Sequence, residues 1–426
     1  MDSLPRMFKI HQKIEAPRVS DVEKEMNHLL DGFGLDGKVK PGERIALTAG
    51  SRGIRDKAKV LKVIAGRLRA LGAKPFLVPC MGSHGGGTPE GQVQILAHLG
   101  ITEEYIGAPI ISSIEVKEIG RTKFGTPVYT DATIYSQADK VIVVNRVKPH
   151  TDFDFEIESG INKMLVIGMG KPQGALMAHR LTIRYGFSTM LTEVQPVVLK
   201  TLPIFFGVAI IENQYDQTAS LHILEPQDFW EGEKPLLKRS KEIMPRLPFR
   251  QMDILVVDEM GKNISGAGMD PNVTGRCYFI GSPPLMEPKV TRIFVRDLTP
   301  ETEGNAIGVG FAEYTTTRLV KKIDPVSTAL NCITGMGPEC GRIPLSFDRD
   351  RDALQAAFDN SGVLNSKELR LAWIKNTLEM EYLWASEPML AEAKANPRVE
   401  IISELQEIPF NAQGNMMMQW PPRWAD

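Results

Sequence analysis

The sequence lacks the patterns that mark zinc knuckles, disulfide frameworks, charged binding surfaces and membrane spans. Its four cysteines lie far apart and form no Cys-x-x-Cys pair, which favours reduced thiols. The formal net charge of -2 gives no electrostatic reason to expect binding to nucleic acid or to a membrane. No apolar run approaches the roughly 20 residues that a membrane-spanning helix needs. Residues 1–13 mix charges without an apolar core, so we expect no secretory signal and a cytoplasmic protein.

Several common catalytic motifs are also missing. No His-Glu-x-x-His, Gly-x-Ser-x-Gly or Ser-x-x-Lys motif stands where chemistry would need it, which excludes the usual zinc-protease, serine-hydrolase and β-lactamase classes. Residues 168–174 read Gly-x-Gly-x-x-x-Gly, but no ribose-binding acid follows, and Lys171-Pro172 lacks the Ser or Thr of a phosphate loop. We therefore expect a tight turn from a strand into a helix there, and no nicotinamide site.

The length of 426 residues predicts more than one domain. From Arg44 onward, short apolar runs alternate with amphipathic stretches, which is typical of βαβ units and a largely parallel sheet. Residues 231–250 are rich in proline and charge and predict a connector. We expect two α/β domains with mainly parallel sheets, residues 1–245 and 246–426, and an active site in the cleft between them.

Apolar runs and turn signals place the individual elements. Helices are expected from about Val60 to Gly72, from Thr88 onward, and near residues 352–358 and 369–380. The acidic residues of the 152–158 segment alternate with apolar ones, which predicts a strand or extended loop with one wet face. Strands are expected at residues 45–48, 75–78, 141–144, 164–167, 253–257 and 292–295.

The histidines carry the strongest functional signal. His84 follows the strand at 75–78 and precedes a run of three glycines, which we interpret as clearance for a ligand. His150 follows the strand at 141–144. Because the carboxyl ends of parallel strands line the ligand crevice of an open α/β sheet, we expect these two imidazoles to be neighbours there. His179 stands near the start of a helix, and the other four histidines (His11, His28, His98 and His222) are expected to be structural.

Three cations complete the candidate set. Lys163 precedes an apolar run, so it either extends to solvent or is a desolvated amine able to bond covalently to a carbonyl or cofactor. Arg52, in the loop after the first strand, could clamp a carboxylate with two parallel hydrogen bonds. Arg276 either completes an anion pocket of the second domain, together with Lys262, Asn272 and Thr274, or lies at the surface.

The order of these residues resembles the nickel-dependent lactate racemase family of 2-hydroxyacid racemases and epimerases. That resemblance implies that Lys163 holds a nickel-pincer nucleotide, a pyridinium mononucleotide with thioamide and thiocarboxylate arms. It implies that His84 and His150 alternate as general acid and base and that His179 ligates the nickel. By the same resemblance, Arg52 binds the substrate carboxylate, and Ser51 offers a hydroxyl beside the cofactor where the family has threonine. Arg276 is the expected substrate contact of the second domain.

The resemblance implies a racemase or epimerase that works by proton-coupled hydride transfer and depends on cofactor-biosynthesis enzymes as partners. The substrate shell departs from that of lactate-specific members. Residues 49–52 read Ala-Gly-Ser-Arg in place of Asp-x-Thr-Arg, and residues 272–276 occupy the region of the family's Gln-x-x-Lys. A longer acidic and aromatic segment separates His150 from Lys163. We therefore expect a small 2-hydroxyacid substrate other than lactate.

Two other classes of function stay open at this point. The first is an oxidoreductase or lyase that uses His84 and His150 with an ordinary divalent metal. The second is a non-catalytic binding homologue that has kept the fold. A pure binder has no need of two imidazoles facing a reactive lysine, so the histidine pair favours an enzyme.

Overall fold

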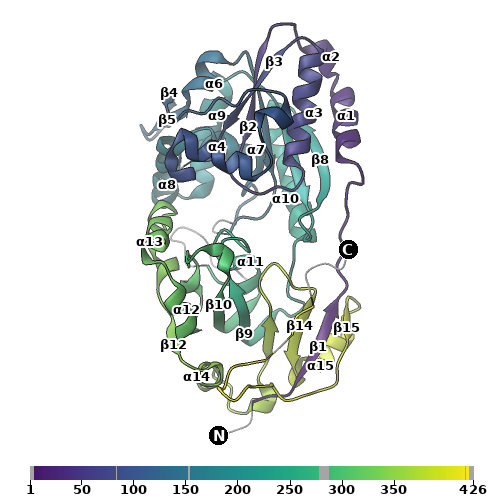
Figure 1. The fold of residues 1–426 in the computed structure, drawn as a ribbon, viewed down its shortest axis with the longest axis vertical. Coiled ribbons are helices and arrows are strands. Elements are labelled where there is room, and N and C mark those ends of the chain that lie inside the picture. The colour runs from purple at the N-terminus through teal and green to yellow at the C-terminus, as the bar shows by residue number, and fades with distance from the viewer. Residues whose placement is uncertain (1–3, 83, 152–153, 278–286, 418, 422–426) are drawn as a thin grey trace. The chain divides into compact units, whose positions relative to one another are not determined.

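The chain divides into two compact units. The structure, a computed structural model, describes residues 4–82, 84–151, 154–277, 287–417 and 419–421. The N-terminal unit comprises Ala16–Met244, and the C-terminal unit comprises Met1–Glu15 together with Pro245–Asp426. We had expected residues 1–15 in the N-terminal domain. They belong to the other unit because β1 (Met7–Gln12) pairs antiparallel with β14 (Tyr382–Ser386) and β15 (Val399–Ile401), as Figure 1 shows for the purple strand.

The N-terminal unit contains a five-stranded sheet in the order β3-β2-β6-β7-β8. The first four strands run parallel and β8 is antiparallel, so the expected, mainly parallel sheet is confirmed. A separate hairpin-like pair is formed by β4 (Val116–Arg121) and β5 (Pro127–Asp131). The strands of the main sheet are β2 (Arg44–Ala49), β3 (Lys74–Pro79), β6 (Lys140–Arg146), β7 (Ile204–Glu212) and β8 (Thr218–Leu224).

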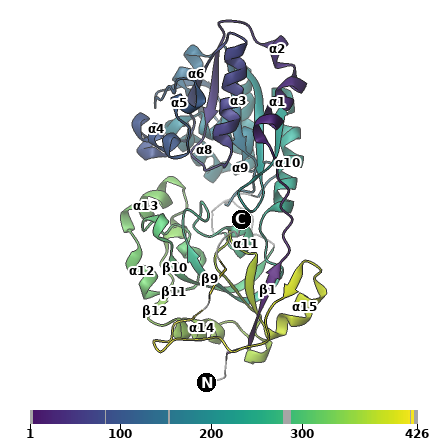
Figure 2. The same cartoon turned by 45° about the vertical axis from the view of Figure 1, so that its right-hand side comes forward.

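Helices cover both faces of this sheet. On one face α1 (Val22–Phe33) and α3 (Lys57–Ala70) pack their buried apolar residues against alternate residues of β2, β6 and β7 (Figure 2). On the other face Gly207 of β7 lies against Ile161 of α7 (Gly160–Lys163). The remaining helices are α2 (Leu35–Lys38), α4 (Pro89–His98), α5 (Glu103–Ile106), α6 (Ala132–Gln137), α8 (Lys171–Tyr185), α9 (Phe187–Thr201) and α10 (Phe229–Ile243).

Two segments of this unit differ from the expectation. Residues 229–243 form helix α10 rather than a connector, because Phe229, Leu237 and Ile243 share one buried face despite the nearby proline and charges. Residues 164–168 form a π-helical turn, η2 (Met164–Gly168), rather than a strand. The turn continues directly from α7, so the apolar run is buried by helix packing and not by strand pairing.

The C-terminal unit contains an eight-stranded sheet in the order β12-β11-β10-β9-β13-β14-β1-β15. The five strands from β12 to β13 run parallel, and the other three are antiparallel. The parallel strands are β9 (Gln251–Met260), β10 (Lys289–Leu298), β11 (Tyr314–Thr316), β12 (Leu345–Phe347) and β13 (Leu371–Ile374). The helices are α11 (Pro271–Thr274), α12 (Thr317–Lys322), α13 (Pro325–Thr334), α14 (Asp350–Asp359) and α15 (Leu390–Ala395).

The sequence predicts a helix at residues 369–380, and this prediction is wrong. Its first part is β13, which lies between β9 and β14 and is buried at all four positions. A strand enclosed on both faces is apolar throughout, so it shows no alternation that would separate it from a buried helix.

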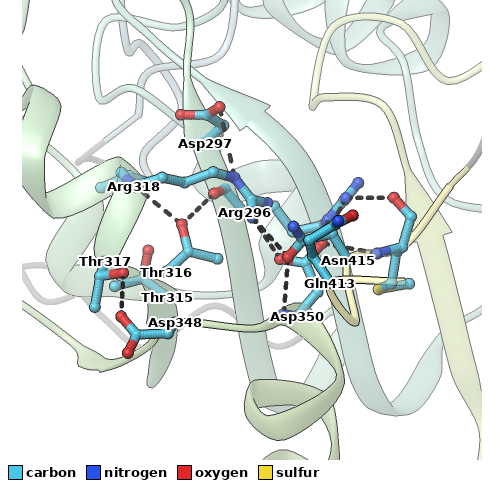
Figure 3. Close-up of polar contacts among 12 residues, drawn as sticks. Arg296, Asp297, Thr315, Thr316, Thr317, Arg318, Asp348, Asp350, Gln413 and Asn415 are labelled. Atoms are coloured by element: carbon cyan, nitrogen blue, oxygen red, sulfur yellow. Dashed lines mark hydrogen bonds and ion pairs between the residues drawn. The ribbon is translucent and has the colours of Figure 1, made fainter. Parts of the chain in front are cut away.

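A cluster of ion pairs fixes the last residues of the chain to this unit. Figure 3 shows Arg296 and Arg318 converging on the carboxylate of Asp350, at 2.6 Å and 2.8 Å. The same carboxylate accepts from the backbone N–H of Met416, whose carbonyl accepts from Arg296 at 2.8 Å. The segment around Met416 is therefore packed on the unit. Within the described ranges, every helix is too short or too polar to cross a membrane.

Candidate active site

The candidate residues of the N-terminal unit follow neighbouring parallel strands. The loop with Ser51 and Arg52 follows β2, the loop with His84 follows β3, and the loop with His150 follows β6. Because β2 pairs with both β3 and β6, the carboxyl ends of all three strands lie at one edge of the sheet. The two histidine loops thus leave the same edge of the parallel sheet, and the expectation that the two imidazoles are neighbours stays a prediction.

A buried lysine holds the first of these loops. Lys57 Nζ donates to the carbonyl oxygens of Gly50 at 2.6 Å and Arg52 at 2.9 Å. Its side chain is almost fully buried, and burial lowers the pKa of Lys57 to about 7, with a further lowering from the charge of Arg146. Sequence reasoning missed Lys57, because a lysine in the first turn of a helix is ordinarily exposed.

An ion pair at the ends of β6 and β7 holds the same region from the other side. The carboxylate of Glu212 accepts from the guanidinium of Arg146 and, at 2.7 Å, from the backbone N–H of Arg55. Ser51 is half-buried and Arg52 is exposed. The backbone that carries both residues is therefore anchored at several points, while the Arg52 side chain reaches solvent.

The His84 ring is oriented by its own loop. His84 Nδ1 lies 2.7 Å from the carbonyl oxygen of Met81. A carbonyl oxygen only accepts, so Nδ1 carries the proton of this hydrogen bond, and Nε2 is the basic nitrogen of the neutral ring. The arrangement suits a general acid or base that works through Nε2.

The glycines after His84 are explained in part by packing within the chain. Gly85, Gly86 and Gly87 all have positive φ, between 66° and 67°. A Cβ atom on Gly85 would lie 2.5 Å from the backbone of Gly91 in α4. Gly85 is therefore required because helix α4 packs against it, whereas the sequence suggested only clearance for a ligand.

The His150 loop is held by a buried carboxylate. The backbone N–H of His150 donates to Glu158 Oε2 at 2.8 Å, and Lys241 pairs with the same carboxylate. Glu158 is 1% exposed, so it faces inward, unlike the wet face expected for the acidic segment. The first residues of that segment, 152–153, lie outside the described residues. The His150 ring stacks on Phe187 with ring centroids 6.3 Å apart.

Burial and positive charges both act on His150. Burial lowers the pKa of His150 well below its ordinary value, and the positive charges of Lys163, Arg52 and His179 lower it further. The charges of Lys163, Arg52 and His179 thus all influence the pKa of His150, and their common site stays a prediction. His150 is held in the neutral form at pH 7, in which it can accept a proton.

A buried glutamate fixes the turn that carries Lys163. The backbone of Ile161 donates to Glu233, and the backbone of Asn162 does so at 3.2 Å. Burial raises the pKa of Glu233 to about 7, against the opposing effect of these hydrogen bonds. Gly160 has a φ of 79°, and a Cβ atom there would lie 1.9 Å from Glu233 Oε1. Lys163 is the last residue of α7, directly before the π-helical turn, a feature that often marks functional sites.

His179 lies on a helix, as the sequence predicts, but in the middle of α8 rather than near its start, and it is half-buried. The glycine-rich segment before it does not form a phosphate-binding loop. Lys171 in that segment is fully buried, and its ammonium lies 3.2 Å from Asp131 Oδ2.

Arg276 lies in the C-terminal unit, where its guanidinium contacts neighbouring strands. It pairs with Glu313, and it donates to the carbonyl oxygens of Val290 at 2.7 Å and Thr291 at 3.3 Å. These contacts give it a structural role at the start of β10. Its role as a substrate contact stays a prediction.

The donor set fits a metal that brings most of its ligands with it. Among the residues that the structure describes, no group of three or more His, Cys, Asp or Glu side chains could hold a metal ion. One imidazole, His179, and one amine, Lys163, both act on the His150 ring. An amine to attach an organic group and a single nitrogen ligand for its metal are what a nickel-pincer nucleotide requires.

Comparison with known proteins finds a family match for the first part of the chain. Residues 6–189 match the lactate racemase N-terminal domain, a range that includes every candidate residue except Arg276. The lactate racemase apoprotein from Thermoanaerobacterium thermosaccharolyticum has a similar fold, with a TM-score of 0.52 over 84% of this chain and 96% of that chain at 13% identity. No curated protein sequence matches the chain. Residues 6–189 therefore belong to the lactate racemase N-terminal domain family, and the protein has the lactate racemase-like α/β fold with two mixed, mainly parallel sheets.

Proposed function

We propose that the protein racemises or epimerises a 2-hydroxyacid other than lactate, with a nickel-pincer nucleotide attached to Lys163. The observation that carries the proposal is that Lys163, Arg52 and His179 all act electrostatically on His150, within a segment that matches the lactate racemase N-terminal domain. Each of these residue types has a distinct task in such a reaction.

In this proposal Arg52 binds the substrate carboxylate. Its side chain is exposed, whereas its carbonyl is held by Lys57, so the guanidinium extends from a fixed backbone. A guanidinium offers a carboxylate two parallel N–H donors, which fixes the orientation of the substrate as well as its position. An arginine that fixes C1 thereby places the C2 carbon between the two histidine loops.

His84 and His150 move the hydroxyl proton. The C2 hydrogen of a 2-hydroxyacid is a poor acid because the carboxylate already carries negative charge. Its removal as a hydride avoids this difficulty, and a nickel-pincer nucleotide held at Lys163 would, when bound, supply the hydride acceptor and return the hydride to the other face of the 2-oxoacid. A histidine takes the hydroxyl proton at the same time, and each stereoisomer presents its hydroxyl to a different imidazole. The neutral ring of His150 and the Nε2 atom of His84 suit this proton transfer.

The proposed substrate differs from lactate because the residues around the carboxylate site differ. Ser51 stands beside Arg52 where lactate-specific members have threonine. The segment after His150 is longer and held inward through Glu158. One changed residue and one longer segment, beside an acid–base pair that is kept, favour a different group on C2, such as a longer chain or a sugar acid.

The first experiment is the intact mass and nickel content of the protein after co-expression with the pincer-biosynthesis enzymes. We expect a nucleotide-sized adduct and about one nickel per chain, both absent from Lys163→Ala. Loaded protein is then screened with single enantiomers of 2-hydroxyacids by chiral chromatography. An unmodified, nickel-free chain from cells that load a known lactate racemase would overturn the proposal. Turnover that instead depends on an added divalent metal, without an adduct, would support the oxidoreductase or lyase.

A further inference from the structure

Three buried polar side chains connect the His84 loop with the start of α8. They are Gln92 of α4, Asp131 at the end of β5 and Lys171, the first residue of α8, and none of them is accessible to solvent. Helices α4 and α8 lie close together in both views (Figures 1 and 2). None of the three residues has a role in the proposed reaction.

The ammonium of the lysine is compensated by nearby oxygen atoms. Lys171 Nζ donates to the carbonyl oxygen of Pro79 at 2.6 Å and to Gln92 Oε1 at 3.1 Å, and it forms an ion pair with Asp131 Oδ2 at 3.2 Å. Two hydrogen bonds and one ion pair therefore stabilise the buried charge. The other oxygen of Asp131 accepts from the backbone N–H of Ile134 and caps α6. A buried charge is costly unless it is paired and hydrogen-bonded in this way.

The backbone of Lys171 is strained. Its φ is 54°, in the left-handed region that a lysine seldom adopts. Such a conformation persists only where the surrounding contacts hold it, and strained residues of this kind gather at functional sites. Here the contacts that hold it lead toward His84.

Hydrogen bonds from this network hold the backbone on both sides of Met81, whose carbonyl oxygen orients His84. Lys171 binds the carbonyl of Pro79, and Gln92 Nε2 donates to the carbonyl of Gly82 at 3.0 Å. The carbonyl of Met81, which accepts from His84 Nδ1, lies between these two anchored groups. If the peptide group of Met81 could rotate, its carbonyl would no longer accept from His84 Nδ1. That hydrogen bond selects the Nδ1–H form of the ring.

We propose that Gln92 and Lys171 are positioning residues that fix the orientation and the tautomer of His84. The network also ties His84 to α8, the helix that carries His179. The proposal rests on the proposed function only in making His84 catalytic, because the state of the His84 ring is measurable in protein without cofactor.

The test is the ring-nitrogen NMR spectrum of histidine-labelled protein, with His84 assigned from His84→Asn. In the wild type we expect the Nδ1–H tautomer. In Gln92→Met, which removes both hydrogen bonds, we expect a mixture of tautomers. Gln94 is exposed on the same helix, so Gln94→Met is the matched control and leaves the ring unchanged.

In loaded enzyme Gln92→Met should lower kcat by about tenfold to a hundredfold with little change in KM, since misplaced catalytic groups cost rates of this order. A mixed tautomer in the wild type, or an unchanged tautomer in Gln92→Met, would overturn the inference even if the racemase activity is found. A protein that never acquires the adduct, yet shows the tautomer change, would overturn the proposed function and leave the positioning role intact. If Gln92→Met does not fold, the wild-type tautomer still decides.

Discussion

Charged side chains buried in the N-terminal unit each bind the backbone of a loop that carries a candidate residue. Lys57 binds the Arg52 loop, Glu158 the His150 loop, and Glu233 the turn before Lys163. Because a buried charge disfavours its own ionised form, each such contact makes stability depend on pH, with a sign set by the charge.

Lys57 should make the protein more stable as the solution becomes alkaline. Its pKa is about 7 in the folded state, against an ordinary value of 10.5, so between these values the unfolded chain holds more protons. The free energy of unfolding therefore rises with pH in this window, by at most about 5 kcal/mol, and the gain is lost as pH falls through 7. Lys57→Met should flatten this rise in denaturant titrations from pH 7 to 10. Lys59→Met, an exposed lysine on the same helix, should keep it.

Glu233 should act in the opposite direction. Its folded pKa of about 7 exceeds the ordinary value of 4.5, so the folded state holds more protons between the two. Stability from this group is present below pH 4.5 and is lost as pH rises through 7, by at most about 3 kcal/mol. Glu233→Gln should remove this decline in the same titrations, whereas the exposed Glu231→Gln should not. An unchanged decline in Glu233→Gln would assign it to another group.

The buried residues Lys57, Glu158 and Glu233 could not be found from the sequence. His84, His150 and Arg52 were predictable because strand ends leave a local signature of a short apolar run followed by a turn. Lys57 and Glu233 have ordinary local surroundings. Their burial depends on which backbone groups the fold brings within reach, and no local pattern encodes that.

Among the elements, the turn that presents Lys163 is the most exacting in its local geometry. Helix α7 begins at Gly160, and the chain then passes through a π-helical turn into α8. An apolar run with this composition predicts a strand as readily as a helix, so only the packing against β6 and β7 decides its conformation.

We expect Gly160→Ala to destabilise the N-terminal unit by more than about 2 kcal/mol, through both the positive φ and the clash with Glu233. Gly186→Ala separates the two effects, because Gly186 also has positive φ but nothing lies within 4 Å of the added Cβ atom. The measurement is the midpoint of thermal unfolding. Equal losses for both variants would show that the contact with Glu233 contributes nothing.

The predicted strands of both units were largely correct because Ile, Val and Phe form short buried runs at β2, β6, β9 and β10. The errors arise where composition and context disagree. The proline and charged residues of helix α10 predict a connector, and the short apolar run of strand β13 predicts a helix.

At the scale of the whole molecule, the first strand belongs to the second unit. β1 lies between β14 and β15, more than 350 residues away in sequence, and a pairing of this range leaves no local trace. The chain therefore passes between the units twice, after Glu15 and after Met244.

Deletion of residues 1–15 should destabilise the C-terminal unit selectively. The loss of β1 removes one of the two partners of β14 and detaches β15 from the sheet. Calorimetry should show one unfolding transition at a lower temperature and the transition of the N-terminal unit little changed. Deletion of residues 1–5, which keeps β1, is the control. A uniform shift of both transitions would indicate that the units unfold together.

The arrangement of β1 also sets an order of events during synthesis on the ribosome. β1 emerges before the elements that follow it in this sequence, yet its neighbour β14 is translated some 370 residues later. At typical elongation rates this delay lasts about 20 to 70 seconds. Residues 16–244 are contiguous and can fold during that interval, whereas β1 must wait unpaired. Its apolar residues, Met7, Phe8 and Ile10, are then a natural binding segment for chaperones that act on nascent chains.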